Sequence, residues 1–149
     1  MHLEKSQKCK ILIMESNTEK FISDELIRTS KLFATKHKPH FPTKEFFSNW
    51  YVKKLEEQNF RCYYCDTSIF DIRKLIYEKK LLARKIGYGF RGPVFEVDKM
   101  NNSLGYSPTN CVLSCYYCNN DKSYTLNSED YKIFFGSGRK AFFDYLLQL

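Results

Sequence analysis

Apolar side chains in the first third of the chain recur at roughly helical spacing in two stretches. The first stretch predicts a helix over residues 18–35, with Asn17 as a candidate cap. Its inward-facing positions are Phe21, Ile22, Leu26, Leu32 and Phe33. Residues 1–16, which precede this helix, are expected to form an arm or an edge strand.

The second stretch predicts a helix over residues 43–58. Pro39 and Pro42 disfavour helix for the residues before them, so the two helices are separate, and Thr43 can cap the second one. The apolar stripe on this helix consists of Phe47, Trp50, Tyr51 and Leu55. Such a stripe is typical of core packing rather than of a ligand site.

The middle of the chain changes from helical to strand-like spacing. Residues 68–86 are expected to form a helix, and its inward-facing positions are Ile72, Leu75, Ile76, Leu82 and Ile86. The glycines and the proline of residues 87–93 predict a loop. Residues 94–100 alternate as in a short strand, and residues 101–110 are rich in turn formers.

The last part of the chain predicts two short helices, over residues 128–135 and 139–148. Gly136 and Gly138 lie between them and are expected to split them. Their phenylalanines and leucines indicate packing rather than chemistry.

Composition and charge favour a polyanionic partner. Of 149 residues, 43% are hydrophobic and 17% aromatic, which is enough for a packed interior and argues against wholesale disorder. The net charge is +7, and residues 71–92 hold seven basic but only two acidic side chains. The basic ones are Arg73, Lys74, Lys79, Lys80, Arg84, Lys85 and Arg91. They could form a surface that follows phosphates, or simply a solvated helix face.

The cysteines indicate metal binding inside a cell. The apolar run Ile11–Met14 is too short for a signal peptide, and no stretch approaches a membrane span. An intracellular, cytoplasmic location is therefore expected, where clustered cysteines more often bind metal than form disulfides. The six cysteines are Cys9, Cys62, Cys65, Cys111, Cys115 and Cys118.

Two C-x-x-C pairs predict a structural zinc site. Cys62 and Cys65 form one pair, and Cys115 and Cys118 form the other. Four thiolates complete the closed tetrahedron that Zn²⁺ prefers, although a redox dithiol or coincidental core cysteines would also fit. Cys9 has no partner at this spacing. Cys111 is expected to be a small buried residue, with a substitute-ligand role as the alternative. Because a four-cysteine site has no open position, any catalysis must use another ion.

With these pairs in place, the chain resembles the zinc-containing HNH endonucleases (the His-Me finger, or ββα-metal, fold). Those proteins read C-x-x-C, then Asp-His on a strand, Asn in the next loop, and C-x-x-C-N-x-x-K. Asp98 falls at the Asp, Lys99 at the His, Asn110 at the loop Asn, Asn119 at the last metal-ligand position and Lys122 at the closing lysine.

The resemblance covers residues 60–123, and the preceding W-Y-x-K-x-L-x-x-Q-x-F resembles the usual lead-in helix. The loop G-Y-S-P-T-N is similar to the G-Y-T-x-x-N of a branch, often phage-encoded, in which Asp-His becomes Asp-Arg or Asp-Lys. The resemblance implies a catalytic Mg²⁺ or Mn²⁺ held by Asp98 and Asn119. One carboxylate oxygen and one amide oxygen are sufficient protein ligands for Mg²⁺, because this ion keeps several water ligands. Asn110 would fix the loop rather than react.

Lys99 leaves the general base open. A lysine is a poor base near neutral pH unless a nearby cation lowers its pKa. Lys99 could be such a base, it could stay charged on the scissile phosphate, or the site could be inactive. We favour the charged role. Other candidate bases are His37, His40, Glu96 and Tyr106, although the two histidines are expected in an exposed loop.

The sequence therefore predicts an α+β fold with a small zinc-stabilised ββα-metal core surrounded by helices. Residues 1–58 would form an arm and helices, residues 59–124 the core, and residues 125–149 the C-terminal helices, all in one compact unit. The expected function is a metal-dependent DNA endonuclease of phage or homing type that nicks a strand. The alternatives are a catalytically inactive DNA-binding module and an RNA-binding zinc protein.

Overall fold

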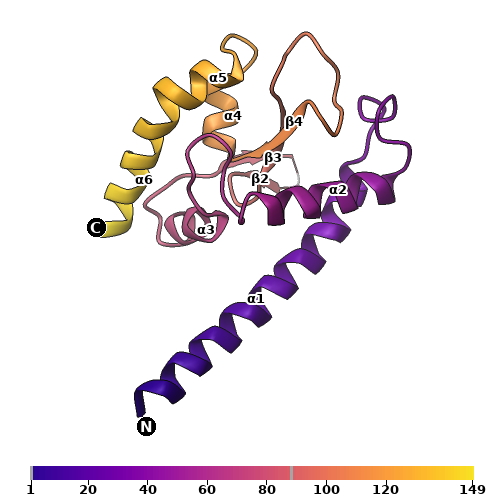
Figure 1. The fold of residues 1–149 in the computed structure, drawn as a ribbon. Helices are drawn as coiled ribbons and strands as arrows, with labels where there is room; N and C mark the ends of the chain where they lie inside the picture. Colours follow the sequence, from indigo (N-terminus) through magenta and orange to yellow (C-terminus); the bar gives the residue numbers. More distant parts are fainter. Residues whose placement is uncertain (1, 88) are drawn as a thin grey trace. The chain divides into compact units, whose positions relative to one another are not determined.

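The computed structural model describes the backbone of residues 2–87 and 89–149, and the side chains of residues 17–87 and 89–149. The chain divides into two compact units, Met1–Val52 and Lys53–Leu149. Figure 1 shows the order of the elements along the chain. The division of the sequence at residues 58 and 124 stays a prediction.

The first unit contains helix α1 (His2–Leu32) and the start of helix α2 (Lys44–Glu57). Because α1 begins at His2, Asn17 is not a cap, and the expected edge strand is wrong; the arm stays a prediction. Residues 2–16 are rich in Lys, Glu, Gln, Leu and Met, which lose little side-chain freedom in a helix. That propensity outweighs the weak apolar pattern of this stretch.

Aromatic rings form the core of the first unit. Phe41 and Phe47 are buried, with their ring centroids 5.1 Å apart. As predicted, Thr43 caps α2, since its hydroxyl accepts a hydrogen bond from the Phe46 backbone N–H at 3.0 Å. The buried Glu25 forms a 2.6 Å ion pair with Arg28 within α1.

In the second unit, helix α3 (Ile69–Tyr77) is much shorter than the helix predicted over residues 68–86. Lys79 adopts a φ of 60°, and the Lys80 backbone N–H donates to the Leu75 carbonyl at 2.9 Å. This is the bond pattern of a Schellman helix end. It stops the helix although no glycine is present.

The chain beyond α3 forms a hairpin of strands β1 (Arg84–Ile86) and β2 (Gly89–Arg91) instead of the expected helix and loop. Leu82 and Ile86 were expected to face inward, and both are exposed. Strand periodicity and helix periodicity are hard to separate over such short apolar runs.

Strands β3 (Glu96–Lys99) and β4 (Cys111–Ser114) pair antiparallel and lead into helix α4 (Tyr116–Lys122). The strand predicted over 94–100 and the loop over 101–110 are confirmed. In the register, Asp98 lies opposite Val112 and Lys99 opposite Cys111. All four residues of β4 are buried, so this strand anchors the ββα arrangement in the core.

The C-terminal region is one continuous helical run and not two helices. It consists of α5 (Ser128–Tyr131), the π-helical turn η1 (Lys132–Gly136) and α6 (Ser137–Gln148). Gly136 keeps helical angles, with φ −59° and ψ −44°. A Cβ at this position would lie 2.2 Å from the Tyr64 carbonyl oxygen. Close approach to Tyr64, rather than helix breaking, therefore explains this glycine.

The fold is α+β, as predicted, with short two-stranded sheets among helices. Within the described part of the chain, no helix is long and apolar enough to cross a membrane.

Candidate functional site

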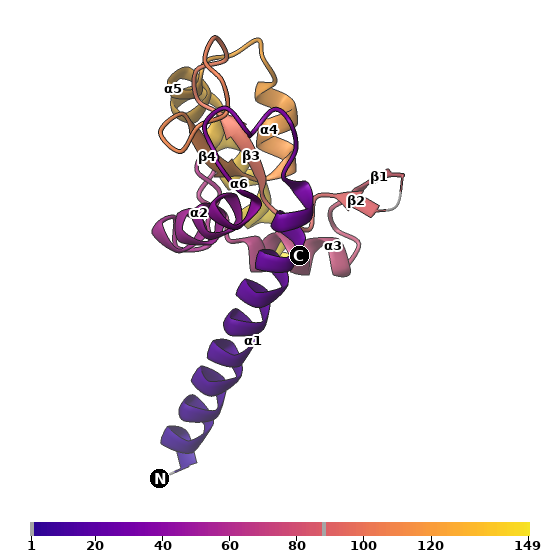
Figure 2. The same ribbon diagram turned by 90° about the vertical axis from the view of Figure 1, so that its right-hand side faces the viewer.

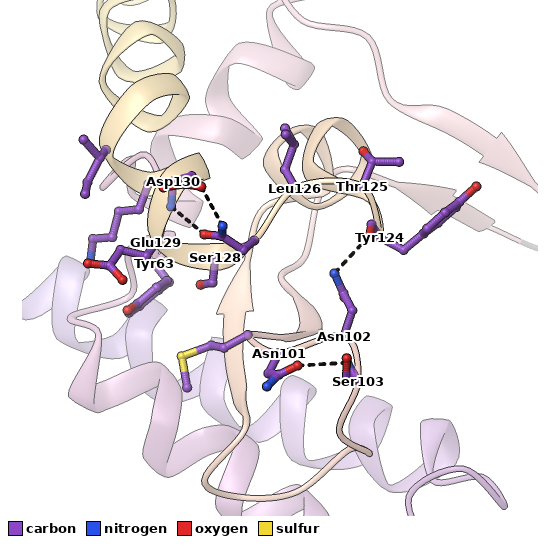
Figure 3. Close-up of a pocket in the computed structure, with 14 residues that line it drawn as sticks. Tyr63, Asn101, Asn102, Ser103, Tyr124, Thr125, Leu126, Ser128, Glu129 and Asp130 are labelled. Atoms are coloured by element: carbon purple, nitrogen blue, oxygen red, sulfur yellow. Dashed lines mark hydrogen bonds between the residues drawn. The ribbon is translucent and has the colours of Figure 1, made fainter.

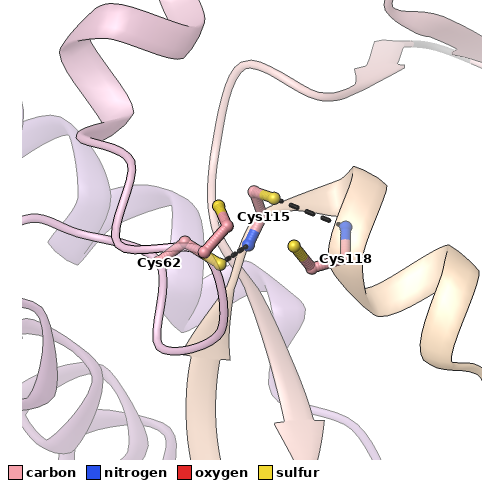
Figure 4. Close-up of side chains that lie close together, drawn as sticks. Cys62, Cys115 and Cys118 are labelled. Carbon is pink, nitrogen blue, oxygen red and sulfur yellow. Dashed lines mark hydrogen bonds between the residues drawn. The ribbon is translucent and has the colours of Figure 1, made fainter. Parts of the chain in front are cut away.

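Four cysteine thiols converge in the second unit, and Figure 4 shows Cys62, Cys115 and Cys118 among them. The Sγ atoms of Cys62, Cys65, Cys115 and Cys118 lie within 4.8 Å of one another, and all four residues are buried. A tight turn carries the first pair, and Asp66 closes it with a φ of 55°. The second pair lies at the start of α4, where Cys115 is the N-cap. This group can bind zinc.

Backbone N–H groups orient the sulfur atoms. The Cys115 N–H donates to the Cys62 Sγ at 3.3 Å, and the Cys118 N–H donates to the Cys115 Sγ at 3.4 Å. Hydrogen bonds from the other thiols, Cys115 first, lower the pKa of Cys65, while burial raises the pKa of Cys115. Four buried thiols cannot all ionise together without a cation, and a divalent ion removes that obstacle.

The two remaining cysteines lie outside this group. Cys111 is buried in β4, in agreement with the expected small buried residue. Cys9 falls in the part of α1 whose side chains the structure does not describe.

Asp98 is buried on β3 and is held by two donors. The Tyr64 hydroxyl donates to its Oδ2 atom at 2.5 Å, and the Lys122 ammonium lies 3.1 Å from the same oxygen. Burial, together with the hydrogen bond to Asp98, raises the pKa of Tyr64 well above its ordinary value. Tyr64 therefore stays a neutral donor to the carboxylate.

Lys122 is fully buried at the end of α4. Its ammonium also donates to the Lys99 carbonyl at 3.2 Å and lies 5.9 Å from the centre of the Tyr64 ring. These contacts fasten the C-terminal end of α4 to the end of β3. The closing lysine of the motif thus holds the site together.

Asn119 faces Glu96 on the neighbouring strand. Its Nδ2 donates to the Glu96 Oε1 at 2.8 Å. The Arg91 guanidinium donates two hydrogen bonds, of 2.7 and 2.6 Å, to the same carboxylate. It also lies 4.6 Å from the Tyr116 ring centre. The hydrogen bond to Glu96 raises the pKa of Arg91.

The sequence pairs Asn119 with Asp98, whereas Asn119 bonds to Glu96 in the structure. Alternate residues of a strand share a face, so Glu96 and Asp98 both lie toward α4. Glu96 contacts Asn119 in the middle of α4, and Asp98 contacts Lys122 at its end. The spacing E-x-D, two residues apart on a strand, was the available signal for this arrangement.

Asn110 closes the loop between β3 and β4. Its Oδ1 accepts from the Asn101 N–H, and its Nδ2 donates to the carbonyls of Asn101 and Gly105, each at 3.0 Å. Its own carbonyl accepts from the Met100 N–H at 2.8 Å. The side chain therefore organises the loop backbone, while a catalytic role for it stays a prediction.

Lys99 lies on the opposite side of β3 from Asp98. Its Nζ is 5.1 Å from the Tyr106 ring centre, a cation–π distance. Burial raises the pKa of Tyr106, which makes this residue a weaker candidate base.

Comparison with known proteins identifies the fold. The chain superposes on the rare-cutting HNH restriction endonuclease PacI with a TM-score of 0.51 and 26% identity, over 66% of this chain and 62% of PacI. The fold is that of an HNH endonuclease. An uncharacterized protein of Acanthamoeba polyphaga mimivirus is 30% identical over 109 residues, which are 73% of this chain and 15% of that protein. The chain thus spans less than two thirds of either relative, and no family model matches it.

A cleft of about 940 Å³ opens beside this HNH-like core (Figure 3). Loop residues such as Asn101 form one wall, and the segment from Tyr124 to Ile133 forms the other. Ser128 lines the cleft, and its hydroxyl lies 3.0 Å from that of Tyr64, which in turn bonds to Asp98. The motif match missed Tyr64 and Ser128. The doubled C-Y-Y-C was the only sequence signal for Tyr64.

The two histidines belong to the first unit. His37 is buried, its ring centroid lies 4.5 Å from that of Phe47, and its Nδ1 accepts from the Ala34 N–H. Burial lowers the pKa of His37. The expectation of an exposed loop is therefore wrong for His37, because local turns fold it into an aromatic core, and correct for His40.

The predicted basic surface of the HNH-like unit is largely exposed. Arg73, Lys74, Lys79, Arg84 and Lys85 are exposed, whereas Lys80 and Arg91 are half-buried. The latter two form ion pairs with Glu78 and Glu96, at 2.8 and 2.6 Å. The exposed basic positions thus lie on α3, directly after it and on the β1–β2 hairpin.

Proposed function

We propose that the protein is a metal-dependent DNA endonuclease of the HNH type that hydrolyses phosphodiester bonds and nicks one strand. The observation that supports the proposal is the HNH-like fold, in which α4 follows the second cysteine pair and contacts β3 through the Asn119–Glu96 and Lys122–Asp98 pairs.

The proposed zinc is structural. Four buried cysteines fill a tetrahedral coordination sphere, which leaves no position for water or substrate. The zinc would join the turn at Cys62 to the start of α4, and α4 carries Asn119 and Lys122. Its role would be to hold the nuclease side chains in register.

The proposed catalytic ion is Mg²⁺ or Mn²⁺, with oxygen ligands from Asp98 and Asn119 and with Glu96 as a third candidate. Hard cations prefer carboxylate and amide oxygens. Such an ion supplies charge neutralisation at the phosphate and at the leaving oxygen. Lys122 and Arg91 form ion pairs with the Asp98 and Glu96 carboxylates.

Lys99 is proposed to bind the scissile phosphate as a cation. The Tyr106 ring centre lies 5.1 Å from its ammonium, a cation–π distance that positions the side chain. A charged lysine cannot accept a proton, so another group or solvent would deprotonate the attacking water. In line with this role, Lys99→Arg is expected to keep more activity than Lys99→Ala.

The test is nicking of supercoiled plasmid with Mg²⁺, with Mn²⁺ and without an added divalent ion. Asp98→Asn removes the charge but keeps an acceptor for Tyr64, and it is expected to lower the nicking rate about 10²-fold or more. Glu56→Gln is the matched control, because Glu56 is an exposed carboxylate of the same unit. It should nick at the wild-type rate. Circular dichroism would establish that Asp98→Asn is folded.

The absence of metal-dependent nicking by the wild-type chain would contradict the endonuclease proposal. The second candidate is then a zinc-stabilised DNA-binding module without catalysis. Lys99 at the position of the usual histidine favours this alternative, as does the Asp98 carboxylate held by Tyr64 and Lys122. It predicts DNA binding that is equal for wild type and Asp98→Asn.

A further inference from the structure

The β1–β2 hairpin is a basic ribbon with two different faces. Its register pairs Arg84 with Arg91 and Lys85 with Phe90. Directly paired residues of an antiparallel ladder lie on the same face. Lys85 and Phe90 therefore share one face, and Phe90 is 58% exposed. Arg84 lies on the other face and is exposed as well.

No acidic residue occurs between Lys79 and Phe95, the stretch that contains the whole hairpin. Exposed cations and an exposed phenylalanine therefore occur together without compensating carboxylates on the ribbon itself. Figure 2 shows β1 and β2 projecting from the body of the second unit. An isolated two-stranded hairpin is at best marginally stable in water, so its root must be held by the rest of the unit.

The root of the hairpin is fixed by α4. The Tyr117 hydroxyl donates to the Leu82 carbonyl at 2.8 Å. Gly92 has a φ of 135°, and a Cβ there would lie 3.0 Å from the same hydroxyl. Arg91, at the end of β2, is bound by Glu96 and lies over the Tyr116 ring. The hairpin is thus tied to the helix and the strand that carry the proposed nuclease residues.

We propose that the β1–β2 hairpin enters the major groove of a duplex DNA substrate, with Arg84 and Lys85 on phosphates and Phe90 against base edges. This inference rests on the proposed function and names the element that docks the substrate. The three residue pairs of the hairpin extend about 10 Å along the strand direction. The major groove is about 12 Å wide and 8.5 Å deep and admits a two-stranded ribbon.

The dimensions of the ribbon favour the major groove over the minor groove. Two paired strands lie about 5 Å apart before their side chains are counted, whereas the minor groove is only about 6 Å wide. An apolar side chain such as Phe90 finds thymine methyl groups in the major groove. Single-stranded DNA would instead stack its bases on the same ring, and the experiment separates the two cases.

The chain of contacts from Arg91 through Glu96 to Asn119 links the hairpin to the proposed metal-binding side chains. A duplex bound by the hairpin would therefore be cut at a fixed distance from the base pairs that the hairpin contacts. Removing the exposed hairpin cations should weaken substrate binding while the reaction at saturating DNA continues.

The experiment measures fluorescence anisotropy of a labelled 30-base-pair duplex across a salt series, without added divalent ion. Arg84→Ala and Lys85→Ala are each expected to weaken binding about 5-fold or more and to lower the slope of log affinity against log salt by about 1. Lys53→Ala is the matched control, since Lys53 is an exposed lysine on α2 in the same unit. This variant should bind DNA within about 2-fold of wild type at each salt concentration, because Lys53 is not proposed to contact a phosphate.

Two further arms identify the groove. A duplex whose pyrimidines carry bulky 5-substituents fills the major groove and should lose the contribution of Phe90, so that wild type and Phe90→Ala bind it equally. Hairpin variants that bind the duplex as wild type does would overturn the proposal. So would a Phe90→Ala loss that appears on single strands and not on the duplex.

Nicking separates this inference from the proposed function. Lys85→Ala should raise the DNA concentration needed for half-maximal nicking and leave the maximal rate within about 2-fold, as expected when only uniform binding is lost. If the wild-type chain does not nick, the endonuclease proposal fails, while the anisotropy series still decides whether the hairpin binds the major groove.

Discussion

Lys122 is a fully buried lysine whose ammonium lies 3.1 Å from the Asp98 carboxylate. Lys122→Met removes the cation and leaves a buried, uncompensated charge on Asp98. Breaking a buried pair in this way costs about 3–5 kcal/mol. Urea denaturation of Lys122→Met should show a loss of this size in the free energy of unfolding.

A double variant gives the control for this pair. Lys122→Met with Asp98→Asn removes both charges together and should recover much of the lost stability, because no isolated charge remains. If the double variant were less stable than Lys122→Met by the full cost of Asp98→Asn alone, the two side chains would not interact energetically.

The sequence motif located most of these residues but not their partners. The resemblance to the HNH motif picks out Asp98, Asn110 and Asn119, which lie on β3, at the end of the following loop and on α4. The bond from Asn119 to Glu96 depends on how α4 is seated against β3. Tyr64 reaches Asp98, and Ser128 reaches Tyr64, across long stretches of chain. Local spacing contains no information on such contacts.

At the scale of elements, Gly136 offers a direct test of packing. A Cβ at this position would meet the Tyr64 carbonyl oxygen at 2.2 Å, which is backbone and cannot swing away. Gly136→Ala is therefore expected to lose roughly 3 kcal/mol of unfolding free energy, measured by chemical denaturation.

Gly138 is the matched control two residues later in α6. A Cβ there meets nothing within 4 Å, so Gly138→Ala should gain about 0.5–1 kcal/mol from helix propensity. Equal effects of the two substitutions would contradict the close approach between the C-terminal helical run and the first cysteine turn.

Two of the mispredicted elements, α3 and the C-terminal helical run, differ from their predictions where tertiary contacts act on them. The predicted helices continued or stopped according to local composition, but tertiary contacts decided their ends. α3 ends at Tyr77, and the residues after it do not extend the helix. The Tyr117 hydroxyl instead donates a hydrogen bond to the Leu82 carbonyl. Gly136 and Gly138 predict a break between two helices, yet the backbone stays helical at Gly136, where the Tyr64 carbonyl leaves no room for a Cβ.

At the scale of the whole molecule, the four-cysteine group joins distant parts of the second unit. Cys118→Ser is expected to lose bound zinc and to lower the melting temperature, because the binding free energy of a structural zinc is folding free energy. Zinc released on denaturation should amount to about one equivalent per wild-type chain, as for a closed tetrahedral site. A metal-sensitive dye would measure it.

Cys111→Ser is the control for this prediction, since Cys111 is buried in β4 but lies outside the group. It should keep its zinc. Wild-type protein that contained no zinc, or a Cys118→Ser variant that kept it, would contradict the assignment of these four thiols.

The position of the cysteine pairs also sets an order of assembly. Cys62 and Cys65 precede β3 and β4, while Cys115 and Cys118 follow them. A nascent chain that has emerged from the ribosome only as far as Asn110 carries half of the zinc ligands and no α4. The proposed hydrolytic centre is therefore incomplete during synthesis and assembles only after the second cysteine pair has emerged. A truncated product that ended before Cys115 would therefore lack the proposed nuclease site.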